Sequence, residues 1–195
     1  MQTSWESLSE EVAHCSRCPL AAGRRNTVLG EGHPHARLML IGEGPGDQED
    51  RTGRPFVGPA GQLLDRILRA IGLDRSDVYI CNVVKCRPPN NRVPEIEERT
   101  ACLGYLRQQA ALVRPRIIVL LGSTAARTVL DPDIRITRSR GVWHFQKGVW
   151  ILPTYHPSAL LRDPEKKRPV WEDFKAIREK MGELGLLQTN VDRSK

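Results

Sequence analysis

Four short apolar runs along the chain predict buried β-strands. They lie at residues 36–42, 78–84, 117–121 and 149–152. Each run is continuous rather than alternating, which is typical of strands that are covered on both faces of a sheet. Residues 141–145 are expected to pair with the fourth run as a hairpin.

Helical patterns separate these runs. Gly72 marks the expected end of the first helix, and Pro94 is expected near the first turn of the second. Ser123 or Thr124 is expected to cap the third. The predicted helices cover residues 63–71, 94–113, 123–130 and 170–181.

Alternating strands and helices predict a single α/β domain with three layers, α/β/α, around a central four-stranded parallel sheet. The domain is expected to span residues 1–195, with frayed ends at about 1–4 and 185–195. Ligands of such sheets bind beyond the carboxyl ends of the strands. The segments that follow the strands are therefore where chemistry is expected.

Composition and charge narrow the class of protein. The 195 residues are 39% hydrophobic and carry a net charge of +7, which favours a polyanionic partner. No apolar stretch reaches the ~18 residues of a membrane-spanning helix, and the N-terminus lacks the apolar core of a secretory signal. We expect a cytoplasmic, nucleoid-associated protein without membrane contact, and a monomer because no heptad run or surplus amphipathic helix is present.

Four of the five cysteines have a spacing that suggests metal binding. Cys15 and Cys18 form a C-x-x-C pair, and Cys86 and Cys102 follow much later. Four thiolates hold either zinc or an iron–sulfur cluster, and the alternative is a redox pair plus unrelated core cysteines. Cys81 lies within a predicted strand and is expected to be a small buried hydrophobe.

The loop after the first strand, residues 42–58, combines glycines with acids. Three glycines in five residues permit close approach to a ligand, but the loop matches neither a Walker A sequence nor G-x-G-x-x-G. Its acids include Glu43 and Glu49, which either orient a water and stabilise developing positive charge or only cap a solvated turn.

Three further side chains each have a functional and a structural interpretation. Phe56 is either a surface on which a base stacks or an ordinary loop anchor. Asn82 carries the amide needed to read a pyrimidine edge, or it caps a turn. His156 is either a donor to a leaving-group anion or a structural histidine.

The segment after the fourth strand places Leu160 and Leu161 beside a run of basic residues. Apolar wedges with basic rims suit proteins that distort nucleic acid. The alternative is the start of a helix with a solvated run of charge.

These pieces together resemble the family 4 uracil-DNA glycosylases, the iron–sulfur branch of the uracil-DNA glycosylase superfamily. The resemblance covers residues 15–180, and the four cysteines match in order and spacing. The matching segments are GEGPG at 42–46, GRPFVG at 53–58, NVVKCRPPNNR at 82–92 and HPSALLR at 156–162.

The resemblance implies excision of uracil from single- or double-stranded DNA. It implies a structural 4Fe–4S cluster bound by the four cysteines, with Phe56 stacking on the base, Asn82 bonding its edge and His156 stabilising the uracil anion. The resemblance also implies that Gly42 and Gly44 line the base site. The residues expected to contact DNA are Lys85, Arg87, Ser158, Leu160, Leu161, Arg162, Lys167 and Arg168.

The group that positions the attacking water is expected to be Glu43, supported by Glu49 and Asn91, because the best-known branch has an aspartate where this chain has Gly44. Two alternatives remain open. One is a uracil-DNA crosslinking variant, although the basic insertion of that branch is missing after Lys85. The other is a non-catalytic iron–sulfur or zinc module that binds nucleic acid.

Overall fold

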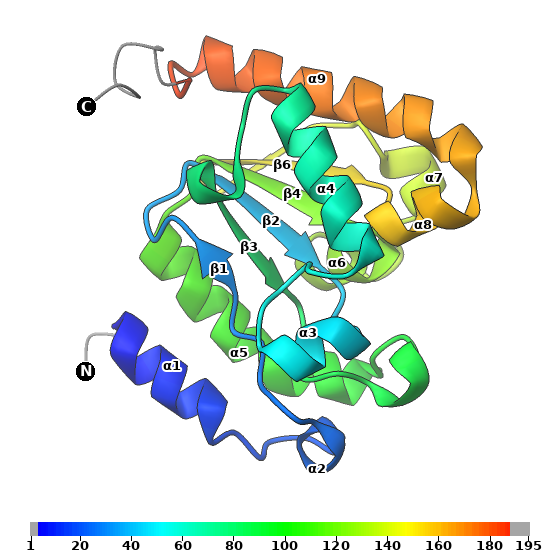
Figure 1. Ribbon diagram of the computed structural model, residues 1–195. Coiled ribbons are helices and arrows are strands. Elements are labelled where there is room, and N and C mark those ends of the chain that lie inside the picture. The colour runs from blue at the N-terminus through cyan, green and yellow to red at the C-terminus, as the bar shows by residue number, and fades with distance from the viewer. Residues whose placement is uncertain (1–3, 188–195) are drawn as a thin grey trace.

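A six-stranded mixed sheet lies at the centre of the protein (Figure 1). The computed structural model describes residues 4–187. The strands lie side by side in the order β1-β3-β2-β4-β6-β5. They are β1 (Glu31–Gly32), β2 (Leu38–Gly42), β3 (Val78–Asn82), β4 (Ile117–Leu121), β5 (His144–Gln146) and β6 (Val149–Thr154).

The four central strands are parallel, as the four apolar runs predict. Strand β2 pairs with β3 and β4, and β4 pairs with β6. The prediction of four strands is incomplete, because β1 and β5 add antiparallel edges to β3 and β6. The β5–β6 hairpin matches the expected pairing. Strand β1 is missed because its two residues, Glu31 and Gly32, form no apolar run.

Helices and short 3₁₀ turns connect these strands. The helices are α1 (Trp5–Ala13), α2 (Leu20–Gly23), α3 (Asp47–Thr52), α4 (Pro59–Ala70), α5 (Ile96–Val113), α6 (Ser123–Val129), α7 (Ile136–Ser139), α8 (Pro157–Arg162) and α9 (Lys167–Glu183). The 3₁₀ turns are η1 (Arg75–Asp77), η2 (Pro89–Asn91) and η3 (Pro164–Lys166).

Each face of the sheet has its own apolar core, so the three-layer prediction is confirmed. Figure 1 shows α4 and α9 on one side of the sheet and α1 and α5 on the other. Side chains of β2 alternate between the cores: Leu40 packs with Phe174 of α9, and Met39 packs with Tyr105 of α5. Continuous burial of the central strands follows from this double cover.

Three helix starts and one helix cap differ from the prediction. Helix α4 begins at Pro59 rather than at residue 63, and α9 begins at Lys167 rather than at residue 170. Helix α5 begins at Ile96 rather than at Pro94, because Glu95 is the N-cap and donates its backbone N–H to Glu98 at 2.7 Å. The N-cap of α6 is Gly122, and neither Ser123 nor Thr124 caps it. The hydroxyl of Thr124 is used elsewhere, as described below.

The chain ends are partly packed where frayed segments are expected. Ser4 caps α1 by accepting from the Ser7 N–H at 3.1 Å. Leu186 and Leu187 pack against the core that contains α9. The rest of the expected frayed ends, residues 1–3 and 188–195, lies outside the described residues.

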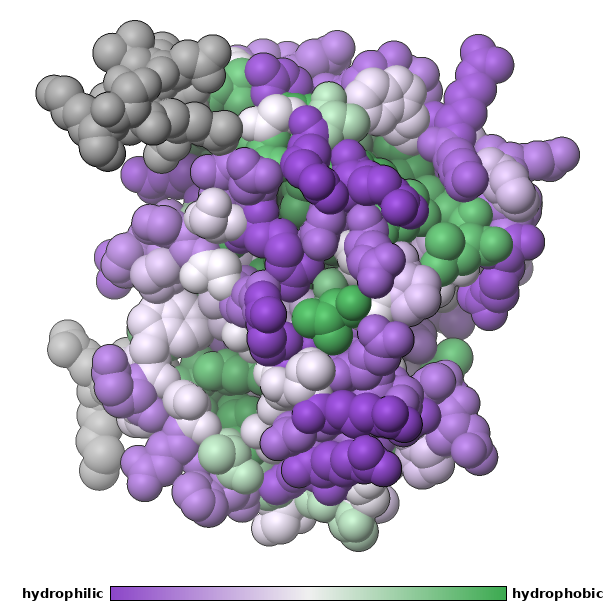
Figure 2. All heavy atoms as spheres, viewed as in Figure 1, coloured by the Kyte–Doolittle hydropathy of each residue, from purple (hydrophilic) through white to green (hydrophobic). Residues whose placement is uncertain are grey.

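One face of the protein is mostly polar. The face drawn in Figure 2 is largely hydrophilic, and its hydrophobic side chains form separate groups. Between residues 4 and 187, no helix has both the length and the apolar composition needed to cross a membrane.

Candidate active site and metal centre

Phe56, Asn82 and His156 meet at the carboxyl ends of the parallel strands. Asn82 ends β3, opposite Gly42 at the end of β2, and His156 follows β6 and precedes α8. The Phe56 and His156 rings lie 5.5 Å apart. A Cβ atom added to Gly42 would lie 2.4 Å from Asn82 Oδ1 and 2.6 Å from the Phe56 ring. The three side chains expected to handle a base therefore share one region.

Asn82 presents a buried acceptor without a partner. The residue is 1% exposed, and no group among the described residues donates a hydrogen bond to its Oδ1. Leaving a buried polar atom unsatisfied costs about 1–3 kcal/mol. Such an atom is retained where a ligand supplies the missing donor, so Oδ1 marks a position for a ligand N–H.

The His156 ring is held in one tautomer. Its Nδ1 accepts the Ser158 backbone N–H at 3.2 Å and lies 2.8 Å from Ser158 Oγ. The neutral ring therefore carries its proton on Nε2. Burial lowers the pKa of His156 to about 4, with the positive charge of Arg162 acting in the same direction and Glu49 opposing it. At neutral pH the side chain is a neutral Nε2–H donor.

Glu43 is positioned by a residue that sequence analysis did not identify. The Thr124 hydroxyl donates to the Glu43 carboxylate across 81 positions of sequence. Thr124 is buried in the first turn of α6, whereas Glu43 is half-buried in the glycine-rich loop after β2. A threonine near the start of a helix resembles a cap, so the sequence carried no signal for this contact.

Glu49 organises the glycine-rich loop. Its Oε1 accepts the backbone N–H groups of Val57 and Gly58, both at 2.9 Å, and its Oε2 accepts that of Gly46 at 3.0 Å. Both oxygens are therefore engaged with the backbone on either side of Phe56. Glu49 fixes the loop that carries Phe56.

Asn91 and Arg87 connect two loops at the rim of the site. Arg87 donates to Asn91 Oδ1 at 2.8 Å and to Asp47 of α3 at 2.6 Å. Asn91 is exposed, with a left-handed backbone at φ 54°. Asn91 ends η2 and Asp47 begins α3, so the Arg87 guanidinium that joins them is already engaged by protein groups.

Two of the expected DNA contacts are corrected by burial. Lys85 is 1% exposed, and its ammonium donates to the backbone carbonyl of Asn82. Leu160 is 2% exposed and packs in the core with Phe174. Neither side chain is accessible to DNA. The sequence shows a lysine after a strand and a leucine pair on a short helix, but not which way they face.

Arg87 is engaged by Asn91 and Asp47, and the other expected DNA contacts lie in α8 and at the start of α9, on the segment that follows His156. Leu161 is 47% exposed, and Arg162, Lys167 and Arg168 are also exposed. Ser158 is half-buried and engaged with the His156 ring. Leu161 and Arg162 end α8, and Lys167 and Arg168 begin α9. An exposed leucine and three exposed cations therefore lie on the segment that follows His156.

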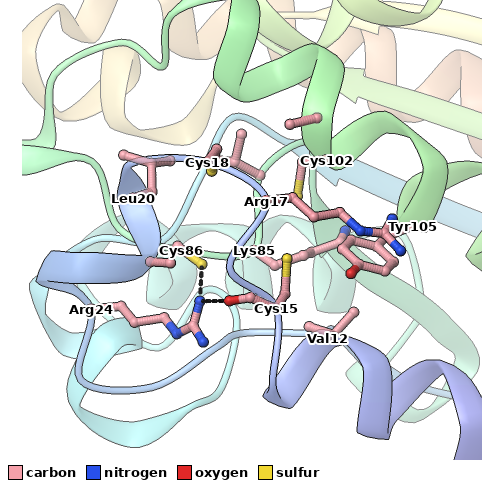
Figure 3. Close-up of a pocket in the computed structure, with 13 residues that line it drawn as sticks. Val12, Cys15, Arg17, Cys18, Leu20, Arg24, Lys85, Cys86, Cys102 and Tyr105 are labelled. Atoms are coloured by element: carbon pink, nitrogen blue, oxygen red, sulfur yellow. Dashed lines mark hydrogen bonds between the residues drawn. The ribbon is translucent and has the colours of Figure 1, made fainter.

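Cys15, Cys18, Cys86 and Cys102 line one pocket (Figure 3). The first two lie between α1 and α2, the third follows β3 and the fourth lies in α5. The Arg24 guanidinium donates to Cys86 Sγ at 3.5 Å and to the Cys15 carbonyl at 2.6 Å. We call this the cysteine pocket. Its other lining residues are Val12, Arg17, Leu20, Ala21, Arg24, Val84, Lys85, Ala101 and Tyr105.

The four thiols of the cysteine pocket are a donor set that suits a thiolate-bound metal centre. Burial raises the pKa of the Cys86 thiol to about 11 and also raises that of Cys102, so a bound cation is needed to stabilise the thiolates. Among residues 4–187, no three His, Cys, Asp or Glu side chains converge closely enough to bind a single metal ion. Thiolates are ligands of both zinc and iron–sulfur clusters, so the chemistry of the four sulfurs is compatible with either.

Cys81 lies apart from this set. It is fully buried in β3, and burial raises the pKa of its thiol. It packs among the apolar side chains of the core next to α5, as a small hydrophobe would.

Comparison with known proteins gives a consistent set of similarities. A model of the uracil DNA glycosylase superfamily matches residues 29–175. The chain is 50% identical to a type-4 uracil-DNA glycosylase of Thermotoga maritima, over 87% of this chain and 90% of the relative. It is 47% identical to a type-4 uracil-DNA glycosylase of Sulfurisphaera tokodaii, over 90% of this chain and 84% of the relative. It is 34% identical to a type-5 uracil-DNA glycosylase of Pyrobaculum aerophilum, over 80% of this chain and 83% of the relative.

Proposed function

This chain belongs to the uracil-DNA glycosylase superfamily, and we propose that Phe56, Asn82 and His156 carry out its reaction, the hydrolysis of the N-glycosidic bond of uracil in DNA. The activity is supported by the type-4 relatives at 42–50% identity. The observation that carries the residue assignment is the unpartnered Oδ1 of Asn82 beside the two rings.

Recognition begins with a base that has left the stack. Enzymes that act on a base in a duplex extrude it into a pocket and read its edge. Phe56 stacks on uracil, and Asn82 Oδ1 accepts the N3–H of the base. Cytosine has no proton on N3, so its lone pair would face the Oδ1 acceptor. A close-fitting pocket rejects the methyl group of thymine.

Bond cleavage leaves an oxocarbenium-like sugar and a uracil anion. The neutral His156 donates its Nε2–H to a carbonyl oxygen of the departing base. This donor is already oriented, because Ser158 fixes the opposite ring nitrogen. Removing one such oriented donor typically costs about 3–4 kcal/mol of transition-state stabilisation.

The water that attacks the sugar is positioned by Glu43. Its carboxylate is anchored by Thr124 at one oxygen, which fixes the direction of the other. Glu49 holds the backbone of the loop, and Asn91 supports its rim through Arg87. Gly42 and Gly44 let the loop pack closely beside the base-handling residues, since a Cβ at Gly42 would lie 2.4 Å from Asn82 Oδ1 and a Cβ at Gly44 would lie 2.8 Å from Val84 Cγ2.

DNA is held by the exposed end of the α8 segment. Leu161 occupies or props the space that the extruded base vacates, and Arg162, Lys167 and Arg168 contact phosphates. The same contacts serve single- and double-stranded substrates. The proposal includes a monomeric enzyme that acts on nucleoid DNA in the cytoplasm.

A 4Fe–4S cluster held by Cys15, Cys18, Cys86 and Cys102 is part of this proposal. When bound, it supplies a rigid crosslink and no redox step. The four cysteines belong to the N-terminal segment, the exit of β3 and α5. Their ligation therefore ties the N-terminal segment to the loop that follows Asn82.

The proposal is tested by incubating the purified protein with matched oligonucleotides that contain one uracil, thymine or cytosine. We expect free uracil and an alkali-sensitive abasic site from the first substrate only. Binding of the uracil oligonucleotide without release of the base would show a non-catalytic module. A stable protein–DNA adduct would show the crosslinking reaction instead.

A further inference from the structure

The backbone of Phe56 has a conformation that an aromatic residue rarely adopts. Its φ angle is +51°, in the left-handed region. A Cβ atom makes this region unfavourable, so residues other than glycine persist there only when their surroundings enforce it. Phe56 is buried, and its ring edge lies against the Gly42 backbone. Something must therefore hold the Phe56 backbone in place.

Arg75 holds the backbone of Phe56 through two carbonyl groups. Its Nη1 donates to the Phe56 carbonyl at 3.0 Å, and its Nη2 donates to the Pro55 carbonyl at 2.7 Å. Arg75 begins η1, directly before β3, the strand that ends at Asn82. One guanidinium thus joins the loop that carries the stacking ring to the strand that carries the amide.

Arg75 is itself fixed by two carboxylates. Its Nε donates to Glu31 of β1 and its Nη1 to Asp65 of α4, both at 2.9 Å. Burial acts to raise the pKa of Glu31, but hydrogen bonds and positive charge from Arg54 and Arg75 outweigh it and lower the pKa. The side chain of Arg75 is 21% exposed. A half-buried arginine with this many acceptors has little freedom to move.

Helix α4 closes the other side of the Phe56 backbone. A Cβ atom added to Gly61 would lie 1.8 Å from the Phe56 carbonyl oxygen. The helix therefore approaches this carbonyl as closely as only glycine permits. The hydrogen bond from Arg75 and the close approach of Gly61 together fix the position of the Phe56 carbonyl group.

We propose that Arg75 is a positioning residue for base recognition, which holds the ring of Phe56 in the orientation that stacks on an extruded pyrimidine. This inference rests on the proposed function, because it needs Phe56 to contact the base. Lysine is not equivalent at this position. Its single ammonium carries positive charge to Glu31 and Asp65 but lacks the planar fork that holds both carbonyls.

The test is a double-mutant cycle between Arg75 and Phe56. The variants are Arg75→Gln, Phe56→Leu and the double variant, with Arg75→Lys as the conservative replacement. Arg54→Gln is the matched control, because Arg54 also binds Glu31, at 2.8 Å, but is exposed. Two quantities are measured: the single-turnover rate of uracil release, and inhibition by free uracil, which reports the base site directly.

We expect Arg75→Gln to slow uracil release and to weaken inhibition by free uracil about tenfold or more, the size of a lost base–aromatic stack. Arg75→Lys should show most of that loss. In the Phe56→Leu background the same Arg75 substitution should have little further effect. Arg54→Gln should stay close to wild type in both measurements.

Three results would overturn the assignment of Arg75. The first is that Arg75→Gln reduces the rate of uracil release equally in the wild-type protein and in Phe56→Leu. The second is that Arg75→Gln releases uracil and is inhibited by uracil like the wild type. The third is that Phe56→Leu is inhibited by free uracil as strongly as the wild type. Circular dichroism identifies variants that do not fold, and Arg75→Lys replaces Arg75→Gln in the cycle if the latter fails to fold. A wild-type protein that releases no uracil would overturn the proposed function itself, which is a distinct result.

Discussion

The ring of Phe56 lies 5.5 Å from the imidazole ring of His156, measured between centroids, with 32° between their planes. A base cannot enter between them, because two contacts of ~3.5 Å would need about 7 Å. We therefore expect the base to lie beside this pair of rings rather than between them, stacked on Phe56 with one edge directed towards His156. His156 then acts as a hydrogen-bond donor, not as a second stacking surface.

Thr124→Val should slow uracil release about tenfold, because it removes a hydrogen bond to the charged Glu43 while keeping the shape of the side chain. Inhibition by free uracil should not change, since Glu43 acts on water. Thr128→Val is the control: its hydroxyl donates to the Thr124 carbonyl in the same helix. If Thr124→Val and Thr128→Val slow uracil release equally, Thr124 does not act through Glu43.

Lys85→Met should lower the free energy of unfolding by about 1–3 kcal/mol, because it removes the buried ammonium that donates to Asn82. It should leave the salt dependence of DNA binding unchanged. Lys167→Met should change the free energy of unfolding little. It should reduce the slope of the logarithm of the DNA-binding constant against the logarithm of salt concentration by about one. Denaturant titrations and DNA binding at several salt concentrations compare the two. A reduced salt slope in Lys85→Met would restore Lys85 as a phosphate contact.

Cys86→Ser should lose the bound metal, because it removes one of the four sulfurs that line the cysteine pocket. The wild-type protein should be brown and contain about four irons per chain, and the variant should be colourless with a lower Tm. Cys81→Ala is the control, since Cys81 lies outside the pocket, and it should keep its iron. Zinc in the wild-type protein, or equal iron loss in both variants, contradicts the proposed cluster.

Stability should depend on pH through His156. The pKa of this side chain is about 4 in the folded protein, against about 6.5 in an unfolded chain. The unfolded state therefore binds more protons between these values, and the free energy of unfolding falls as the pH drops from about 6.5 towards 4. His156→Gln removes this contribution. Thermal unfolding at pH 7.5 and 5 should show a smaller loss of Tm in the variant, and equal losses would contradict the lowered pKa.

The sequence predicted the parts of the fold that depend on local patterns. Four continuous apolar runs were enough to define the central parallel strands, because double burial requires them. The edge strand β1 was missed, since Glu31 and Gly32 pair with β3 without an apolar pattern of their own. Strand pairing at an edge depends on the neighbouring strand, not on the local sequence.

The site was predicted in its residue types and only partly in its contacts. Phe56, Asn82 and His156 do meet, because the carboxyl ends of parallel strands share one edge. The burial of Lys85 and Leu160 depends on which groups pack against them, which no local pattern encodes. The Thr124–Glu43 bond and the four acceptors of Arg75 join segments far apart in sequence, so only the folded structure reveals them.

The central claim is that His156 stabilises the departing base, and single-turnover release of uracil by His156→Ala tests it most directly. The account predicts release slower by about 10²–10³-fold, with affinity for uracil-containing DNA nearly unchanged. Release at the wild-type rate, or a loss of affinity as large as the loss of rate, would contradict it.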